Sequence, residues 1–350
     1  MTTKTISTYI AAGYTLSSSF SELLITKTGG VGGTGVKATA SALVDNYGKV
    51  NASGSNFGID LVAGGGVFNE QGGSISGQSG VVLGGAGYVT NNGVITATNG
   101  SAIVLTKGGT VTNGGYSNLT ALISGGEIFI TGGVGTVRNL ATIKAGGVYL
   151  QSGGSVTNGG SGDTTAVIND YGVVVTGGPG TVSNYGLITS RSRGVEVEGG
   201  GRVTNGAATD ITAKIQANIG VDTFLGATVT NFGVIRGTQG AVAMNGGGVL
   251  TNGTALDQAA LVEGYTGAAI FGGAGTVVNF GTIRGDGVLL NTEGLYLGGG
   301  GRVTNGSIDD TAALIVGASG VVMATVGWWP ISAPSTAPPA LASSSARAGF

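Results

Sequence analysis

The sequence contains no cysteine and no histidine, and only 9% of its residues are charged. The lack of both residue types excludes a disulfide framework, thiol catalysis, the usual Ser-His-Asp triads and the common zinc sites. Proline occurs only five times and there is no Gly-X-Y period, which excludes collagen. The net charge is −2 and the basic residues are scattered singly, so no basic stripe follows a nucleic-acid backbone.

Long apolar runs are also missing. No stretch approaches the ~18 uninterrupted apolar residues of a transmembrane helix. The first ten residues carry one lysine and no continuous apolar segment, so they do not form a standard signal peptide. We therefore expect any address for export to lie elsewhere or to have been lost.

What the sequence does contain is glycine, 74 residues of 350, and a 41% hydrophobic fraction rich in Val, Ile and Ala. Charge is too sparse to keep such a chain expanded, so most of it is expected to fold. A short phrase recurs twelve times: an apolar residue, nearly always Val, then any residue, then Asn, at spacings of 19 to 27 residues. Its asparagines are Asn46, Asn69, Asn91, Asn113, Asn139, Asn158, Asn184, Asn205, Asn231, Asn252, Asn279 and Asn305.

Each unit of the repeat consists of short strands in which Val and Ile alternate with Thr, Ser, Arg and Asn, separated by Gly or Asn turns. Strands this short become stable by stacking, each in parallel with the same strand of the next unit. Glycine occupies the corners because it adopts positive φ without steric cost. We assign the recurrent asparagines to a structural ladder rather than to ligand binding, because Asn tolerates the left-handed region and stacked amides bond to one another.

Between Asn113 and Asn252 the spacings alternate between long and short, so the period there is a pair of rungs. The long rungs carry an insert, with an Asn or Asp five residues after the ladder position. These residues are Asn118, Asp163, Asp210, Asp257 and Asp310. We assign the four aspartates to structural turns. Calcium is the alternative, but its ligands must converge within ~2.3–2.6 Å of the ion, whereas residues on every second rung are roughly 10 Å apart.

These patterns predict an all-β fold, a single right-handed parallel β-helix (β-solenoid) of about twelve rungs over residues 42–326. Residues 1–41 lack the asparagine phrase and are expected to form an N-terminal capping segment. Residues 327–350 hold four of the five prolines and both tryptophans, and are expected to form a disordered Pro/Ala/Ser tail.

The tail has a second interpretation, a frameshift. In a reading frame that starts at the third base of each codon, every new codon combines that base with the first two bases of the next codon. In this frame Met323–Ala324 must encode Gly, Trp328–Trp329 must encode Val, and Trp329–Pro330 must encode Ala. The neighbouring triplets permit Gly-Asn-Gly-Gly-Val-Val-Ala-Asn-Phe-Gly-Thr-Ile-Asn-Gly, which is another copy of the repeat. Our hypothesis is that the tail is the frameshifted, prematurely ended part of a longer repeat protein.

The sequence predicts no catalytic residue, no cofactor and no metal site. The best carboxylate pair is Glu196 and Glu198, on one face of a strand, and two carboxylates so placed are able to act on a glycosidic bond. The alternative, which we favour, is a solvated strand face neutralised by Arg191 and Arg193. The Gly-rich runs precede strands rather than helices, so they are not phosphate-binding loops.

The phrases Val-Thr-Asn-Gly, Gly-Thr-Val-Val-Asn-Phe-Gly-Thr-Ile and Gly-Val-x-Leu-x-x-Gly-Gly resemble the Gly-rich β-helix repeats of bacterial autotransporter passengers and surface adhesins. They look closest to the N-terminal repeats of secreted proteins that end in a Hint domain, and the opening Ile-Ser-Thr-Tyr-Ile-Ala-Ala-Gly-Tyr resembles the start of such chains. The resemblance covers about residues 1–326. A Hint domain needs a catalytic Cys and His, and this sequence has neither.

The function expected from these features is a non-catalytic scaffold, secreted or on the cell surface, that contacts glycans or a host surface. End-to-end self-association of the solenoid is a further expectation. Two alternatives remain open: a polysaccharide-active β-helix enzyme, and a passive spacer for a lost C-terminal effector domain. An enzyme requires one irregular rung with clustered acids, bases and aromatics, and the rungs of this sequence vary little.

Overall fold

The structure is a computed structural model that describes residues 2–115, 117–160, 162–287, 292–307 and 312–324. The regular elements among these residues are all strands, so the fold is all-β. Within that part of the chain there is accordingly no helix with the length and apolar character needed to cross a membrane. The chain divides into two compact units, Met1–Gly178 (unit 1) and Pro179–Phe350 (unit 2).

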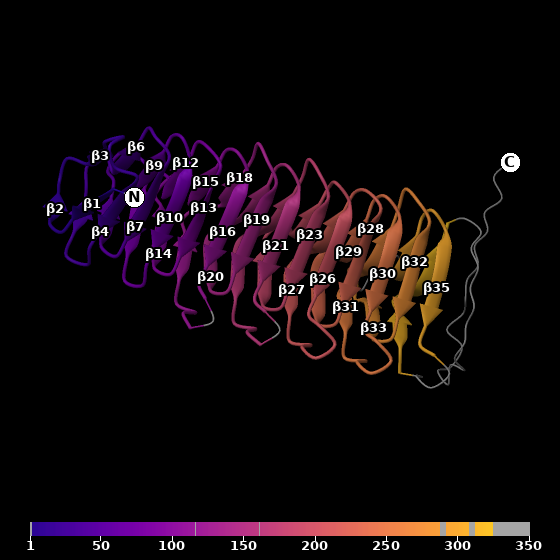
Figure 1. Ribbon diagram of the computed structural model, residues 1–350. Coiled ribbons are helices and arrows are strands. Elements are labelled where there is room, and N and C mark those ends of the chain that lie inside the picture. Colours follow the sequence, from indigo (N-terminus) through magenta and orange to yellow (C-terminus); the bar gives the residue numbers. More distant parts are fainter. Residues whose placement is uncertain (1, 116, 161, 288–291, 308–311, 325–350) are drawn as a thin grey trace. The chain divides into compact units, whose positions relative to one another are not determined.

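Unit 1 is a stack of parallel strands, which follow one another in chain order in Figure 1. Its asparagine sheet, which holds the recurrent Asn phrase, runs in the order β1-β4-β7-β10-β13-β16-β19-β21. These strands are β1 Thr3–Ile6, β4 Glu22–Ile25, β7 Ala42–Asn46, β10 Gly65–Asn69, β13 Gly87–Asn91, β16 Gly109–Asn113, β19 Gly135–Asn139 and β21 Gly154–Asn158. The second sheet contains β2 Tyr9–Ile10, β3 Tyr14–Leu16, β5 Gly30–Val31, β6 Val36–Ala38, β8 Lys49–Asn51, β9 Ile59–Leu61, β11 Ser74–Gly77, β12 Val81–Leu83, β14 Val94–Ala97, β15 Ile103–Leu105, β17 Leu122–Ser124, β18 Ile128–Ile130, β20 Thr142–Leu150 and β22 Val167–Val175.

Unit 2 repeats this arrangement. Its asparagine sheet runs in the order β23-β26-β28-β30-β32-β35. These strands are β23 Gly180–Asn184, β26 Gly201–Asn205, β28 Ala227–Asn231, β30 Gly248–Asn252, β32 Gly275–Asn279 and β35 Gly301–Asn305. The second sheet contains β24 Leu187–Ser190, β25 Arg193–Val197, β27 Lys214–Thr223, β29 Val234–Met244, β31 Leu261–Ile270, β33 Thr282–Gly285, β34 Glu293–Leu297, β36 Leu314–Val316 and β37 Ser319–Met323.

The predicted parallel β-solenoid is confirmed, but the number of rungs is not. Among the described residues, unit 1 has eight rungs and unit 2 has six, which makes fourteen rather than about twelve. The two additional rungs lie in residues 1–41, where β1 pairs with β4 and β4 with β7 in the same parallel register as the later strands. These residues begin the stack of unit 1 as rungs in their own right. The tail over residues 327–350 lies outside the described residues.

The core of each unit is a set of apolar columns, because the same position of each rung faces inward. In unit 1, Val67 pairs with Val44 on one side and with Val89 on the other, and the side chains of all three are at most 1% exposed. Full burial of a valine contributes roughly 1.5–3 kcal/mol, so a dozen such positions stabilise strands that are too short to stand alone. The alternating burial of the strands therefore follows directly from the alternating sequence.

The corners between strands require glycine at specific places. Gly201 begins β26 with φ of 125°, a backbone conformation that residues with a side chain rarely adopt. A Cβ at this position would collide with the carbonyl oxygen of Gly180 on the preceding rung. At this position glycine is thus needed for both the turn and the close stacking of rungs.

On five of the later rungs the two strands of the second sheet merge into one long, bent strand. Strands β20, β22, β27, β29 and β31 have nine to eleven residues. The bend of β20 and β22 contains Ala145 and Asp170, the non-glycine residues with positive φ in the described part of the chain. Their register shifts at the bend, since Gly146 pairs with Asp170 between two regular stretches. The bend recurs in unit 2 as a register shift between Gly237 and Gly240.

Candidate functional site

The structure places the described asparagines of the repeat in one buried column in each unit. All but Asn305 are fully buried, with 0% of the residue exposed. Within a unit each side-chain amide donates from Nδ2 to Oδ1 of the next asparagine, at 2.7–2.8 Å. The first two rungs carry Ile6 and Ile25 in this column instead. Because the amides are inaccessible and satisfied by one another, the column is a structural element of the core.

One reason given for these asparagines from the sequence is wrong. Asparagine was expected partly because it tolerates the left-handed region, yet the ladder positions are not among the residues with positive φ. They end extended strands, and their side chains also bond to the backbone of the following turn. Asn139 illustrates this, since Nδ2 donates to the carbonyl of Ala141 at 3.1 Å and Oδ1 accepts from the N–H of Ala141 at 3.3 Å.

The aspartates of the long rungs lie in tight turns. Asp163 and Gly160 exchange two backbone hydrogen bonds of 2.9 Å, and Oδ1 of Asp163 accepts from the backbone N–H and the hydroxyl of Thr165 at 3.1 and 2.7 Å. Asp210 and Asp257 repeat the bond to the backbone N–H two residues later, at 3.1 Å. Asp310, the fourth predicted turn residue, lies outside the described residues. No group of three or more acidic residues that could hold a metal ion occurs in the part of the chain that the structure describes.

Glu196 and Glu198, the sequence-derived carboxylate pair, lie in different surroundings. Glu196 is half-buried on β25 with its Oε1 3.7 Å from Nε of Arg193, whereas Glu198 follows the strand and is exposed. Nε of Arg193 also lies 2.6 Å from Oδ2 of the buried Asp222, which accepts a further bond from Asn245 at 2.8 Å. Burial raises the pKa of Glu196, and Arg193 opposes this effect. The cluster is an ion-paired network on the outer face rather than an open carboxylate pair.

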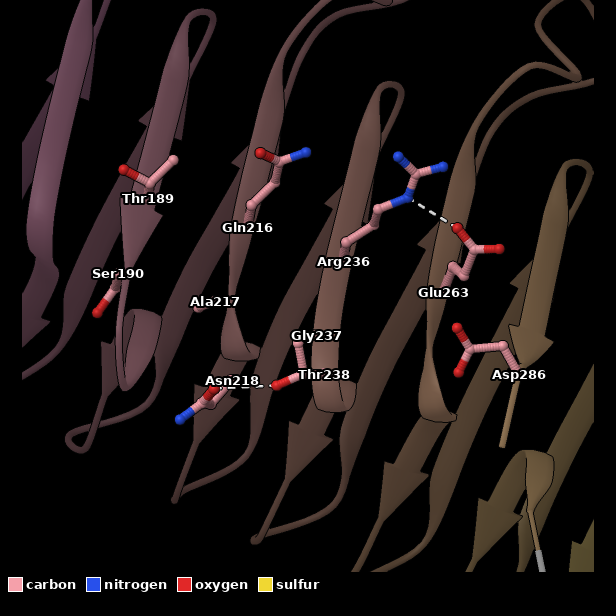
Figure 2. A pocket seen from close by; sticks show the side chains of 10 residues that line it. All are labelled: Thr189, Ser190, Gln216, Ala217, Asn218, Arg236, Gly237, Thr238, Glu263 and Asp286. Atoms are coloured by element: carbon pink, nitrogen blue, oxygen red, sulfur yellow. Dashed lines mark hydrogen bonds and ion pairs between the residues drawn. The ribbon is translucent and has the colours of Figure 1, made fainter. Parts of the chain in front are cut away.

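Sequence reasoning did not identify a second feature, a polar trough on the outer face of the second sheet in unit 2. It has a volume of about 520 Å³ and crosses five successive rungs. Figure 2 shows the side chains that line it, from β24 at one end to the residue after β33 at the other. The lining residues are Thr189, Ser190, Gln216, Ala217, Asn218, Arg236, Gly237, Thr238, Glu263 and Asp286.

One wall of the trough is a column of polar side chains in register. Thr189 pairs with Gln216, Gln216 with Arg236, and Arg236 with Glu263. Nε of Arg236 donates to Oε2 of Glu263 at 2.7 Å, and Nη1 of Arg284 lies 3.6 Å from Oε1 of the same carboxylate. Both oxygens of Glu263 are therefore already engaged with cations, which leaves it poorly suited to act as an acid or a nucleophile.

The floor of the trough is made of small residues. Ala217 and Gly237 line it and pair with each other in register. A Cβ on Gly237 would collide with the carbonyl oxygen of Gly240, where the strand bends, so the bend itself keeps side chains out of the floor. On the far side the hydroxyl of Thr238 donates to Oδ1 of Asn218 at 2.9 Å (Figure 2).

The trough offers hydroxyls, amides, the guanidinium of Arg236 and the carboxylates of Glu263 and Asp286 to a ligand, and no aromatic residue is among those that line it. Such a surface is able to form hydrogen bonds with a polar polymer. The chain was compared with protein-family models, curated proteins and solved structures, and nothing in any of the three matches it.

Proposed function

We propose that the protein is a non-catalytic repeat scaffold that works outside the cell or at its surface and contacts glycans. The polar trough of unit 2 is the observation that carries this proposal, because it joins side chains from five rungs into one continuous surface. The extracellular location rests on the resemblance of the repeat phrases to those of bacterial surface adhesins and autotransporter passengers.

The electrostatics of the outer face support a binding role over a catalytic one. In the trough Glu263 is paired with two guanidinium groups, and beside it the Arg193 guanidinium serves both Glu196 and Asp222. A glycosidase needs one carboxyl group free to give a proton and a second free to attack or to activate water. Neither cluster offers such a pair.

A binding screen of the whole chain tests the proposal. Purified protein is incubated with immobilised glycans and with surfaces coated with extracellular matrix, and bound protein is measured against a denatured control. The scaffold proposal expects retention on at least one class of glycan without release of shorter products. Shortened glycan products would support an enzyme, and the absence of binding to every surface would support a passive spacer.

A further inference from the structure

We infer that the trough of unit 2 takes an extended, neutral glycan that lies across the rungs and is held by hydrogen bonds without ring stacking. This inference rests on the proposed function and adds to it the site, the direction and the chemical class of the ligand. It draws on the register of the floor, the balance of charge in the lining and the kinds of polar group present.

The direction of the ligand follows from the floor. Ala217 and Gly237 are neighbours on successive rungs, so the open channel runs across the strands. Along each strand the channel is closed, on one side by Gln216 and Arg236 and on the other side by the hydrogen-bonded pair of Asn218 and Thr238. Successive rungs lie about 4.8 Å apart, close to the length of one sugar residue in an extended chain, so five rungs span roughly 19 Å. Each sugar of such a chain therefore lies over the lining groups of its own rung.

The charge of the lining favours a neutral ligand. Arg236 is the one cation among the lining residues, and its Nε is occupied by Glu263 at 2.7 Å. Asp286 adds a second carboxylate at the end of the trough. An acidic sugar placed here would meet two carboxylates and a cation that is already paired, and like charges brought together cost binding free energy.

The remaining lining groups match sugar hydroxyls. Thr189, Ser190 and Thr238 carry hydroxyls and Gln216 and Asn218 carry amides, so each of them is able both to donate and to accept. A sugar hydroxyl also does both, whereas an acidic group only accepts. Since the lining has no aromatic ring, affinity must accumulate from one rung to the next. Longer oligosaccharides should therefore bind more tightly until the five rungs are filled.

Two variants of similar size and location separate the trough from the rest of the outer face. Thr238→Leu replaces a hydroxyl of the trough wall by an apolar side chain without touching the core, because Thr238 is an exposed residue of β29. Ala243→Leu introduces a leucine at a half-exposed residue of β29 that does not line the trough. Circular dichroism of both variants establishes that they fold like the wild type.

The experiment is affinity electrophoresis, which measures how far a polysaccharide in the gel slows the migration of the whole chain. The neutral probes are glucan, mannan, xylan and galactan, and the acidic probes are polygalacturonate and hyaluronan. We expect retardation by a neutral polysaccharide that changes little with salt, with affinity lowered about tenfold or more by Thr238→Leu and unchanged by Ala243→Leu. Calorimetry with oligosaccharides from disaccharide to hexasaccharide of the retarding polymer should show affinity rising with length.

The outcomes separate the two proposals. Preference for an acidic probe, or equal binding by the two leucine variants, would overturn the inference and leave the scaffold function standing. Binding of no glycan by the folded wild-type chain would overturn both.

Discussion

Replacement of one ladder asparagine by alanine tests how much the buried amide column contributes to stability. Asn231 lies at the end of β28 in the middle of unit 2 and is fully buried. Its Nδ2 donates to Oδ1 of Asn252 at 2.8 Å and to the carbonyls of Gly233 and Leu261 at 3.0 and 3.1 Å. Its Oδ1 accepts from Nδ2 of Asn205 at 2.8 Å. Asn231→Ala removes these four bonds.

The magnitude follows from what remains unsatisfied. Asn205 still donates to the carbonyls of Ala213 and Val234 at 3.3 and 3.1 Å, so its amide keeps partners. Oδ1 of Asn252, in contrast, loses the donor that the ladder supplies, and a buried polar group without a partner costs about 1–3 kcal/mol. Adding the net worth of the lost bonds, we expect Asn231→Ala to lower the free energy of unfolding by roughly 3–5 kcal/mol.

Hydrogen exchange followed by mass spectrometry is the suitable assay, because repeat arrays do not always unfold in a single step. Protection should fall most in peptides from β28 and β30. Thr230→Ala is the matched control, since Thr230 precedes Asn231 on the same strand but is half-exposed on the outer face. We expect that control to stay within about 0.5 kcal/mol of the wild type. An Asn231→Ala variant no less stable than the Thr230→Ala variant would refute the proposed role of the column.

Three further predictions concern positions where the fold is under strain or polar groups lack partners. Asp170→Gly should stabilise unit 1 by about 0.5–1 kcal/mol in urea denaturation, because Asp170 has a φ of 103°, which glycine adopts at a lower cost in conformational energy. Unchanged stability of the variant would contradict this expectation. Asp163→Asn should stabilise unit 1 by about 1 kcal/mol, because Oδ2 of Asp163 is buried without a hydrogen-bond partner. In the equivalent turn, Nδ2 of Asn118 donates to the carbonyl of Asn92 at 2.6 Å, and the new asparagine should form the corresponding bond. A loss of stability would count against the equivalence of the two turns. Burial is the largest cause that raises the pKa of Asp45 above its ordinary value of 3.8, and Glu22 is the next. The folded chain therefore binds the proton of this carboxyl group more tightly than the unfolded chain does. The folded chain loses stability as pH rises through the raised pKa of Asp45. Asp45→Asn should not show this loss, and parallel stability profiles of the two proteins against pH would contradict the assignment.

The fold was predictable because each copy of the repeated phrase contains the residues that determine how its own rung packs on the next. A Val at one position and an Asn two residues later specify an inward apolar column and an inward amide column, and both are present. The structure has two rungs more than the predicted twelve for an equally local reason. Ile6 and Ile25 fill the asparagine position in the first two rungs, so these rungs lack the phrase by which the others were counted.

The trough was not predictable in the same way, because it depends on which residues of different rungs come into register. Gln216, Arg236 and Glu263 are unequally spaced in the sequence, and their alignment depends on how the backbone of each rung turns. One signal was available. Gln216 and Arg236 each directly follow the buried isoleucine of their rung, so alignment of the rungs on that isoleucine would have revealed the polar wall.

The most direct test of the account is whether neighbouring rungs are stacked in the stated register, on which the core, the asparagine columns and the trough all depend. Thr230 and Thr251 are paired on adjacent rungs, and the sequence has no cysteine of its own, so a disulfide can be introduced cleanly. Paired residues of neighbouring strands lie about 4.8 Å apart, within the Cα separation that a disulfide spans. We predict that the double variant T230C/T251C oxidises rapidly to an intramolecular disulfide, and that T228C/T251C, which is out of register, does not. Equal oxidation of the two variants, or none in the first, would contradict the stacking.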